Sequence, residues 1–286
     1  MRLLRTVVLV AVAVGLAAPA FAEDPFYLYQ RGTFGAQGDI SFESETAYGN
    51  RETRLLGEDA IEQAMRLRIA GADWLSFEGW GGIAMRTGAD TGEDGNNYAV
   101  AGDVFARVLN QEAHYLNLSL GLGYLYDYGE TSIPRARLTL ARRWGRFDLS
   151  FATLAEMPLS GEEEEEEAEA EGEAEEEEEE EEAAYDEVDL MFTLAASYAV
   201  ADWARLGVES VLEDTEGFWE EEEAEGGAKL LLGPTASFAV AQNFYVRANT
   251  AAVIPVTTNQ QTRVPGGTTQ NDTGFLGRVA LGYTFK

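Results

Sequence analysis

The chain has 286 residues, no cysteine, a single histidine and a formal net charge of −31 at pH 7. So acidic a chain is a poor nucleic-acid binder, because phosphates repel it, and we expect no nucleic-acid partner. Without cysteine it can form neither a disulfide framework nor a lipid attachment through sulfur. Residues 161–184 hold 17 glutamates, and the net charge without them would be −14, so the acidity is concentrated in one segment.

The first segment predicts export. Residues 1–22 carry Arg2 and Arg5, then an apolar stretch, then Ala20-Phe21-Ala22, which is the pattern of a secretory signal peptide with its cleavage site. The alternative is a membrane anchor, but about 15 apolar residues fall short of the ~20 that span a bilayer as a helix. We therefore expect a mature chain that begins near Glu23, with residues 23–286 as one domain.

The rest of the chain alternates between apolar and polar residues with a period of two, which is typical of β-strands with one apolar face. In the last segment, Phe275, Val279, Leu281, Tyr283 and Phe285 share one face. The pattern predicts twelve strands near residues 33–47, 60–71, 74–87, 98–110, 115–128, 134–144, 147–157, 185–199, 202–213, 227–240, 243–256 and 274–286. Most are longer than the usual five or six residues and match the 9–11 tilted residues that cross a bilayer.

The links between these strands alternate in length. After even-numbered strands they are short, as at Ala72-Asp73, Gln111 to His114, Gly145-Arg146, Asp202 and Gln242. After odd-numbered strands they are mostly long, at 48–59, 88–97, 129–133, 158–184, 214–226 and 257–273. A soluble β-sandwich has no reason to alternate in this way. An up-and-down transmembrane β-barrel does, with short periplasmic turns and long extracellular loops.

Aromatic residues gather near the short links, where a periplasmic aromatic girdle belongs. They are Trp74, Trp144, Phe147, Tyr198, Trp203, Phe244, Tyr283 and Phe285. Ordinary strand-end aromatics in a soluble barrel are the alternative. The strand number, the link pattern and this girdle together predict an all-β fold with one antiparallel barrel of about twelve strands.

At the level of architecture, the chain resembles the Gram-negative outer-membrane β-barrel proteins, the porins among them, over residues 26–286. Proteins of this class carry an assembly signal in the last strand, and Arg278, Ala280, Tyr283 and Phe285 match it, with Ala280 at a position where glycine is usual and Lys286 added after the final aromatic. The resemblance implies an outer-membrane location, outer-membrane lipid and the assembly machinery as partners, and no cofactor. It names no subfamily and leaves the oligomeric state open.

If the apolar faces contact lipid, the opposite faces line the lumen, and nearly all charges within the strands fall there. Across the short links we expect three directly opposed pairs that stiffen the wall: Arg68 with Glu78, Arg143 with Asp148, and Arg135 with Glu156. Such pairs contribute ~0.2–1 kcal/mol each. A second set of arginines has no acidic residue directly opposite, with Arg66 facing Trp80, Arg137 facing Leu154, Arg205 facing Ser197, Arg247 facing Ser237 and Arg107 near Asn117 or Ser119.

These arginines and Arg278, with Asp103 and Glu209 as acidic exceptions, predict an excess of positive charge at middle depth. Rings of arginine suit anions in pores. The prediction is a constriction with a modest preference for anions, and a closed, fully paired interior is the alternative. At the level of function, a passive channel for ions or small hydrophilic solutes stands against a non-conducting barrel that acts structurally, adhesively or through partners at its acidic loops.

No enzyme is expected. His114 lies in a short link, on the periplasmic side by parity, with no serine beside it for nucleophilic attack. No metal-ligand spacing is recognisable, and the Gly/Asp-rich segment 88–97 lacks the spacing of a calcium loop.

Two long links carry distinctive residues. Phe218-Trp219 stands in the acidic link 213–229, where exposed aromatics can anchor a loop at the membrane interface, fold into the barrel mouth or meet a partner. The glutamate-rich segment 161–184 is expected to be a disordered extracellular loop, because like charges repel and apolar residues are absent. It could gather divalent cations diffusely or repel polyanions, but a tolerated insertion without a specific role is favoured.

Overall fold

The computed structural model describes residues 37–51, 53, 59–86, 96–127, 132–157, 188–213, 215, 228–256 and 273–285. Within these ranges the chain forms twelve β-strands and one short helix. They are β1 (Ile40–Gly49), β2 (Ala60–Ala72), β3 (Leu75–Arg86), β4 (Asn96–Leu109), α2 (Gln111–His114), β5 (Asn117–Asp127), β6 (Ser132–Trp144), β7 (Phe147–Glu156), β8 (Asp189–Ala201), β9 (Ala204–Glu213), β10 (Lys229–Ala241), β11 (Phe244–Pro255) and β12 (Gly274–Phe285).

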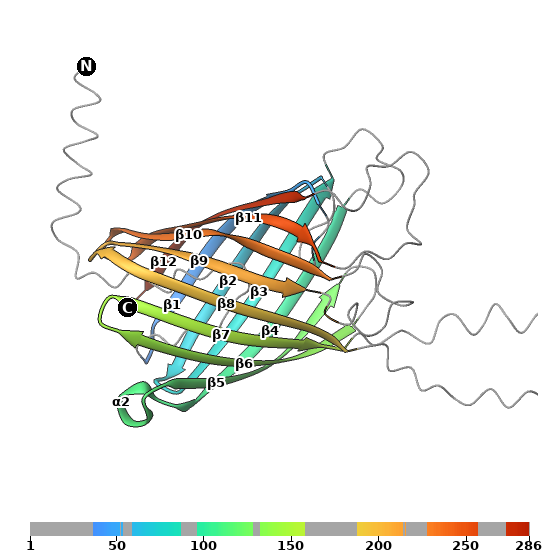
Figure 1. The fold of residues 1–286 in the computed structure, drawn as a ribbon. Coiled ribbons are helices and arrows are strands. Elements are labelled where there is room, and N and C mark those ends of the chain that lie inside the picture. The colour runs from blue at the N-terminus through green and yellow to red at the C-terminus, as the bar shows by residue number, and fades with distance from the viewer. Residues whose placement is uncertain are drawn as a thin grey trace, which may run out of the picture.

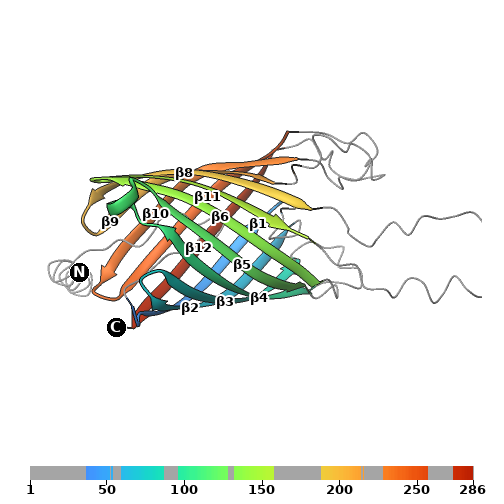
Figure 2. The ribbon, with the colours of Figure 1, turned by 90° about the horizontal axis from the view of Figure 1, so that it is seen from below.

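The strands form a closed barrel in which each strand pairs with its sequence neighbours and β12 pairs with β1. All of these pairings are antiparallel. Figures 1 and 2 show the strands tilted around a common axis. Closure satisfies the backbone groups that an open sheet edge would leave unpaired in lipid. The predicted fold and the twelve strands are therefore confirmed.

The strand ends agree with prediction to within a few residues, except at the start of β1. A strand was expected from residue 33, but β1 begins at Ile40, after a turn at Gln37-Gly38 in which Gly38 has φ 91°. Residues 33–36 lie outside the described ranges. A positive φ is readily accessible to glycine and ends a strand, which alternation alone does not detect.

The two faces of the wall follow the predicted alternation. In β12, Phe275, Val279, Leu281, Tyr283 and Phe285 are exposed on the outer face, and the residues between them are buried or half-buried. The other strands present large apolar side chains outward in the same way, such as Met65, Leu67, Val104 and Leu122. This apolar exterior is the surface that a hydrocarbon layer stabilises.

The short links join neighbouring strands at one end of the barrel, on the left in Figure 1. The strand ends that precede and follow the long links lie at the other end. Hereafter these are the short-link end and the long-link end. A β-bulge precedes or follows four of the five short links, between Ala70 and Ala72, Arg107 and Leu109, Ala199 and Ala201, and Ala239 and Ala241. The fifth, between β6 and β7, is a regular two-residue turn in which Gly145 has φ 59°, the left-handed conformation that such turns require.

The link between β4 and β5 contains a helix that the sequence did not predict. Asn110 caps α2 by accepting a hydrogen bond from the Glu112 backbone N–H at 3.0 Å. The Gln111 side chain forms two hydrogen bonds with the backbone of β6, donating to the Arg143 carbonyl at 2.8 Å and accepting from the Arg143 N–H at 2.7 Å.

Among the described residues, no helix is long and apolar enough to cross a bilayer.

Aromatic side chains surround the short-link end on the outer face. Trp74, Trp144, Tyr198 and Trp203 are about half exposed, and Trp144 stacks on Phe147 with ring centroids 6.0 Å apart. Tyr283 and Phe285 meet edge to face at 4.8 Å. The predicted girdle is therefore present, and the aromatic part of the expected assembly signal belongs to it.

Candidate functional site: the inner wall of the barrel

The inner wall carries most of the charged side chains of the described strands. Of the predicted lumen residues, Arg66, Arg137, Arg205, Arg247, Arg278, Asp103 and Glu209 are buried on the inner face. Arg107 is only half-buried and stands two residues before the end of β4, opposite Ser119. It therefore lies near the short-link end and not at middle depth, because β4 ends soon after it.

The largest charge cluster is built around Arg66 on β2. One guanidinium nitrogen, Nη1, lies 2.8 Å from Oε1 of Glu43 and 3.5 Å from Oε2 of Glu45, both on β1. Its Nε lies 3.3 Å from Oε1 of Glu78 on β3, and Glu78 also accepts from Arg68 at 3.1 Å. Arg66 thus contacts three carboxylates from the strands on either side of its own.

Two arginines from the C-terminal strands complete this cluster. Arg247 on β11 forms an ion pair with Glu43, and Arg278 Nε on β12 lies 3.5 Å from Oε1 of Glu45. Arg247 reaches across β12 to β1, and the β12 residues on that path, Ala280 and Gly282, are small. The cluster therefore joins the first three strands to the last two, across the seam that closes the barrel.

A second cluster spans β4 to β7. Arg135 on β6 pairs with Asp103 on β4, across Gly123 of the intervening strand, and lies 3.8 Å from Glu156 on β7. A Cβ atom at Gly123 would lie 1.9 Å from Asp103 Oδ1, so only glycine leaves room for the pair. The neighbouring Arg137 reaches across Gly121 in the same way, and its guanidinium lies 5.6 Å from the centre of the Phe105 ring.

A third cluster lies toward the short-link end. Asp148 on β7 accepts from Arg143 Nε at 2.6 Å and also pairs with Arg205 on β9. The register places Arg205 opposite Ala199, not opposite Ser197 as predicted, because the chain turns at Asp202-Trp203, between the paired residues Ala201 and Ala204. The Ser197 hydroxyl is still 3.5 Å from Arg205 Nη2, since the long side chain spans the difference.

Strand register places the three predicted pairs in direct opposition, Arg68 with Glu78, Arg143 with Asp148 and Arg135 with Glu156. It also places Arg66 opposite Trp80, Arg137 opposite Leu154 and Arg247 opposite Ser237. The predicted excess of unpaired arginine is nevertheless wrong for Arg66, Arg205, Arg247 and Arg278, all of which form ion pairs.

The reason for this error is geometric. Glu43 faces Arg66 directly, but across β1 and β2, whose long link does not determine a register. Arg278 contacts Glu45 diagonally across the pairing of β12 with β1, and the partners of Arg205 and Arg247 lie two strands away, so none of these three is a directly opposed pair. Small residues at inner positions, such as Gly123 and Gly282, are the sequence signal that could have indicated such contacts.

Glu209 has a neutral partner. Its Oε2 accepts from Asn249 Nδ2 at 3.0 Å, and both side chains are buried, at 0% and 1% exposure. Glu209 and Asn249 belong to β9 and β11, so this contact also crosses a strand. Asn249 was not among the predicted site residues, because an asparagine on a polar face carries no distinctive pattern.

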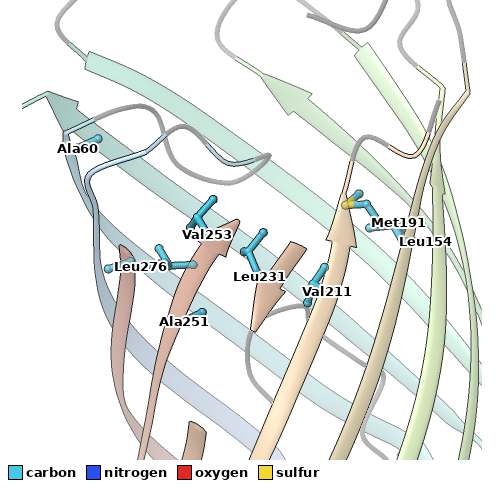
Figure 3. Packing of buried hydrophobic residues seen from close by; sticks show 9 residues of the cluster. Ala60, Leu154, Met191, Val211, Leu231, Ala251, Val253 and Leu276 are labelled. Atoms are coloured by element: carbon cyan, nitrogen blue, oxygen red, sulfur yellow. The ribbon is translucent and has the colours of Figure 1, made fainter. Parts of the chain in front are cut away.

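The long-link end of the wall is lined by apolar residues, which we call the apolar collar. Figure 3 shows their side chains at the ends of the strands. The collar consists of Ala47, Ala60, Leu154, Met191, Val211, Leu231, Ala251, Val253 and Leu276, with Ala84 packed against it. All nine residues face the interior and are buried. The alternation of apolar and polar residues predicts a polar inner wall and does not indicate this collar.

The described residues contain no group of three or more acidic or histidine side chains that could hold a metal ion. His114 lies on α2 at the short-link end and is exposed. The predictions for residues 1–22, 88–95, the glutamate-rich segment 161–184 and Phe218-Trp219 concern parts of the chain outside the described ranges.

No protein-family model and no curated protein matches the sequence. Solved structures do match. A KdgM porin in complex with disordered oligogalacturonate covers 86% of this chain and 99% of its own, with 8% identity and a TM-score of 0.51. The NanC porin covers 85% and 98%, with 6% identity and a TM-score of 0.54. The COG4313 outer-membrane channel from Pseudomonas putida F1 covers 90% and 100%, with 11% identity and a TM-score of 0.52. The chain therefore has the fold of these outer-membrane porins and channels, a closed antiparallel β-barrel of twelve strands.

Proposed function

We propose that the protein is a passive channel for ions or small hydrophilic solutes in the outer membrane of a Gram-negative bacterium. The observation that carries this proposal is the contrast between the two faces of the closed wall. The outer face is apolar and bounded by aromatics, whereas the inner face carries acidic and arginine side chains over much of its length. Such a wall separates lipid from a polar interior.

The size of the barrel supports the same proposal. Barrel diameter grows with strand number, and about eight strands leave an interior just wide enough for side chains, whereas 16 to 18 leave a wide aqueous channel. Twelve strands lie between these limits. Because the inner side chains are largely buried, the passage that we propose is narrow and suits small solutes.

The charge pairing bears on which solutes would pass. Arg66, Arg205, Arg247 and Arg278 are engaged with carboxylates, which offsets much of the positive field predicted from the sequence. We therefore propose a mixed-charge lumen with weak ion selectivity. Although the KdgM porin was solved with oligogalacturonate, the paired arginines here do not favour an equivalent polyanion track.

The alternative function is a non-conducting barrel that acts structurally, adhesively or through partners at its long links. The low exposure of the inner side chains is the observation in its favour.

Measurement of the ionic current across a planar bilayer distinguishes the channel from the non-conducting barrel. We expect the purified protein, with folding confirmed by its electrophoretic mobility before and after heating, to produce discrete current steps. Silence at high protein dose, with insertion verified, would favour the non-conducting barrel.

Ion preference tests the lumen more closely. Replacing Arg137 with Gln removes a positive charge from the inner wall, so we expect the reversal potential in a salt gradient to shift toward cations. Arg142→Gln is the matched control, because Arg142 faces outward, 4.8 Å from the centre of the Trp144 ring. An equal shift in both variants, or none in Arg137→Gln, would contradict a role for the inner arginines in selectivity.

A further inference from the structure

The collar residues occupy one level of the barrel. Leu154, Val211 and Val253 each lie two positions before the end of their strands, and Met191, Leu231 and Leu276 each lie two positions after the start of theirs. Because these strand ends are the ones next to the long links, the six side chains stand at the same distance from the long-link end. Figure 3 shows them around this end of the wall.

Neighbouring collar residues are also partners in the strand register. Val211 lies opposite Leu231, and Leu231 lies opposite Val253. Leu154 is opposite Met191, and Ala251 is opposite Leu276. Opposed side chains on one face of a sheet are close enough to contact one another, so the collar forms one apolar stretch on β7 and β8 and another on β9 to β12, with Thr193 of β8 opposite Val211 between them. On β5 and β6, Leu125 and Ile133 are opposed in the same manner.

The collar is a band between two charged levels. Two positions deeper on the same inner faces stand Glu209, below Val211, and Arg278, below Leu276. Two positions nearer the long links stand Glu156, Glu213 and Lys229. If apolar packing alone stabilised the interior, apolar residues would be expected at every level. Deeper inner positions instead hold alanines and the aromatics Phe105 and Tyr245, whereas the larger buried aliphatic side chains gather near the long links, which points to a role along the axis.

An ion that moves along this axis leaves one charged level, crosses the collar and enters another. At the collar it loses water without gaining polar partners from these nine side chains, which is unfavourable. Apolar constrictions in pores gate by dewetting for this reason. The charged levels can hold and pass an ion, whereas the collar sets the barrier.

We propose that the apolar collar is a hydrophobic gate, which limits the flow of inorganic ions through the lumen. This inference rests on the proposed channel function. It locates the main barrier at the long-link end and not among the arginines, and it attributes the barrier to lack of polarity and not to charge. Solutes with some apolar surface would cross the collar more readily than bare ions of the same size.

The test replaces collar side chains with polar ones of similar volume, as in the triple variant Val211→Thr, Leu231→Asn and Leu276→Asn. We expect potassium chloride current per inserted barrel to rise by about tenfold, because a barrier lower by ~1.4 kcal/mol changes a rate by that factor. The control is Leu231→Met with Leu276→Met, which changes shape but stays apolar, and its current should match that of the unmodified protein. If the triple variant does not insert, Leu231→Asn alone gives the same comparison.

The outcomes separate the two proposals. Equal current from the unmodified protein and the polar variant would overturn the gate and leave the channel standing. A comparable rise in the methionine control would also overturn the gate, because loosened packing would then explain it. If neither the unmodified protein nor any inserted polar variant conducts, both the gate and the channel are wrong.

Discussion

Small inner residues decide which charges can meet. Gly123 lets Arg135 reach Asp103, Gly121 lets Arg137 approach Phe105, and Gly282 lies beneath the ring of Tyr245. In the first two cases the two side chains that meet belong to the strands on either side of the glycine. In the third case the ring extends over the glycine from the neighbouring strand. The contacts across a strand therefore depend on a third residue that makes no polar contact through its own side chain.

Substitution of Gly123 with Ala tests this dependence. Its Cβ would lie 1.9 Å from Asp103 Oδ1 and 2.8 Å from the Gly102 carbonyl oxygen, so the ion pair must move. We expect the free energy of unfolding to fall by about 1–3 kcal/mol, the usual range for overpacking. Urea titration of the refolded protein in lipid vesicles measures it.

The matched control for this substitution is Gly102→Ala. Gly102 lies on the outer face of the adjacent strand, and a Cβ there has nothing within 4 Å. Its unfolding midpoint should stay close to that of the unmodified protein. Equal losses in the two variants would indicate that backbone flexibility, not room for the ion pair, explains the effect.

Among the elements, the link between β4 and β5 is tied to its neighbour in an unusual way. The Gln111 amide satisfies both backbone polar groups of Arg143, on a strand to which β4 is not paired. Asn110 caps the N-terminus of α2 in this link, and the Gln111 backbone N–H donates a hydrogen bond to Asn117 Oδ1 at 2.9 Å. These side-chain bonds hold α2 against β6 at the short-link end.

Replacing Gln111 with Ala should therefore loosen β6 locally. Two hydrogen bonds are lost, each contributing about 1 kcal/mol. We expect amide hydrogen exchange at Arg143 to accelerate while exchange at the centre of β6, around Arg137, stays unchanged. Glu112→Gln is the control, because Glu112 takes part in the helix cap through its backbone N–H. Unchanged exchange at Arg143 would show that the Gln111 bonds do not limit its opening.

At the scale of elements, most of the fold can be predicted from the alternation of apolar and polar residues and from the lengths of the links. Twelve strands, their two faces and the end that carries the short links all follow from these two patterns. The bulges and α2 do not, because one inserted residue or four helical residues leave the apolar pattern almost intact. The bulge beside Ala199 is an example, since Ala199 pairs with Arg205 while Ala201 pairs with Ala204.

The site is less predictable than the fold for a physical reason. Directly opposed pairs across short links follow from counting residues, and Arg68 with Glu78 is an example. Pairs across long links or across a whole strand, such as Glu43 with Arg247, depend on barrel curvature and on side-chain length. The collar was missed because an apolar residue at an inner position resembles a local break in the alternation.

For the whole molecule, we expect the wall to form independently of the segment that dominates its net charge. The link with the 17 glutamates joins β7 to β8. These two strands pair with each other directly, from Phe147 opposite Tyr198 to Glu156 opposite Asp189. We therefore expect deletion of residues 161–183 to leave folding and single-channel conductance nearly unchanged. Heat-modified mobility and bilayer current measure the two properties.

A loss of barrel assembly in this deletion variant would contradict the placement of the segment outside the wall. A shorter control deletion within the link between β11 and β12, residues 257–272, distinguishes an effect of charge from an effect of link shortening. Only the first deletion changes the net charge by 17 units, because it alone removes the glutamates.

The pairing of Glu43 with Arg247 has a consequence for the order of folding. The two residues are 204 positions apart in sequence, and their strands are brought together only when β12 pairs with β1. Until that seam forms, Glu43 lacks the Arg247 guanidinium, and contacts of such long sequence separation are intrinsically slow to form. Arg66 on β2 pairs with Glu43 without that seam, so completion of the wall gives this carboxylate its second guanidinium, and the last strand pairing secures the first strand.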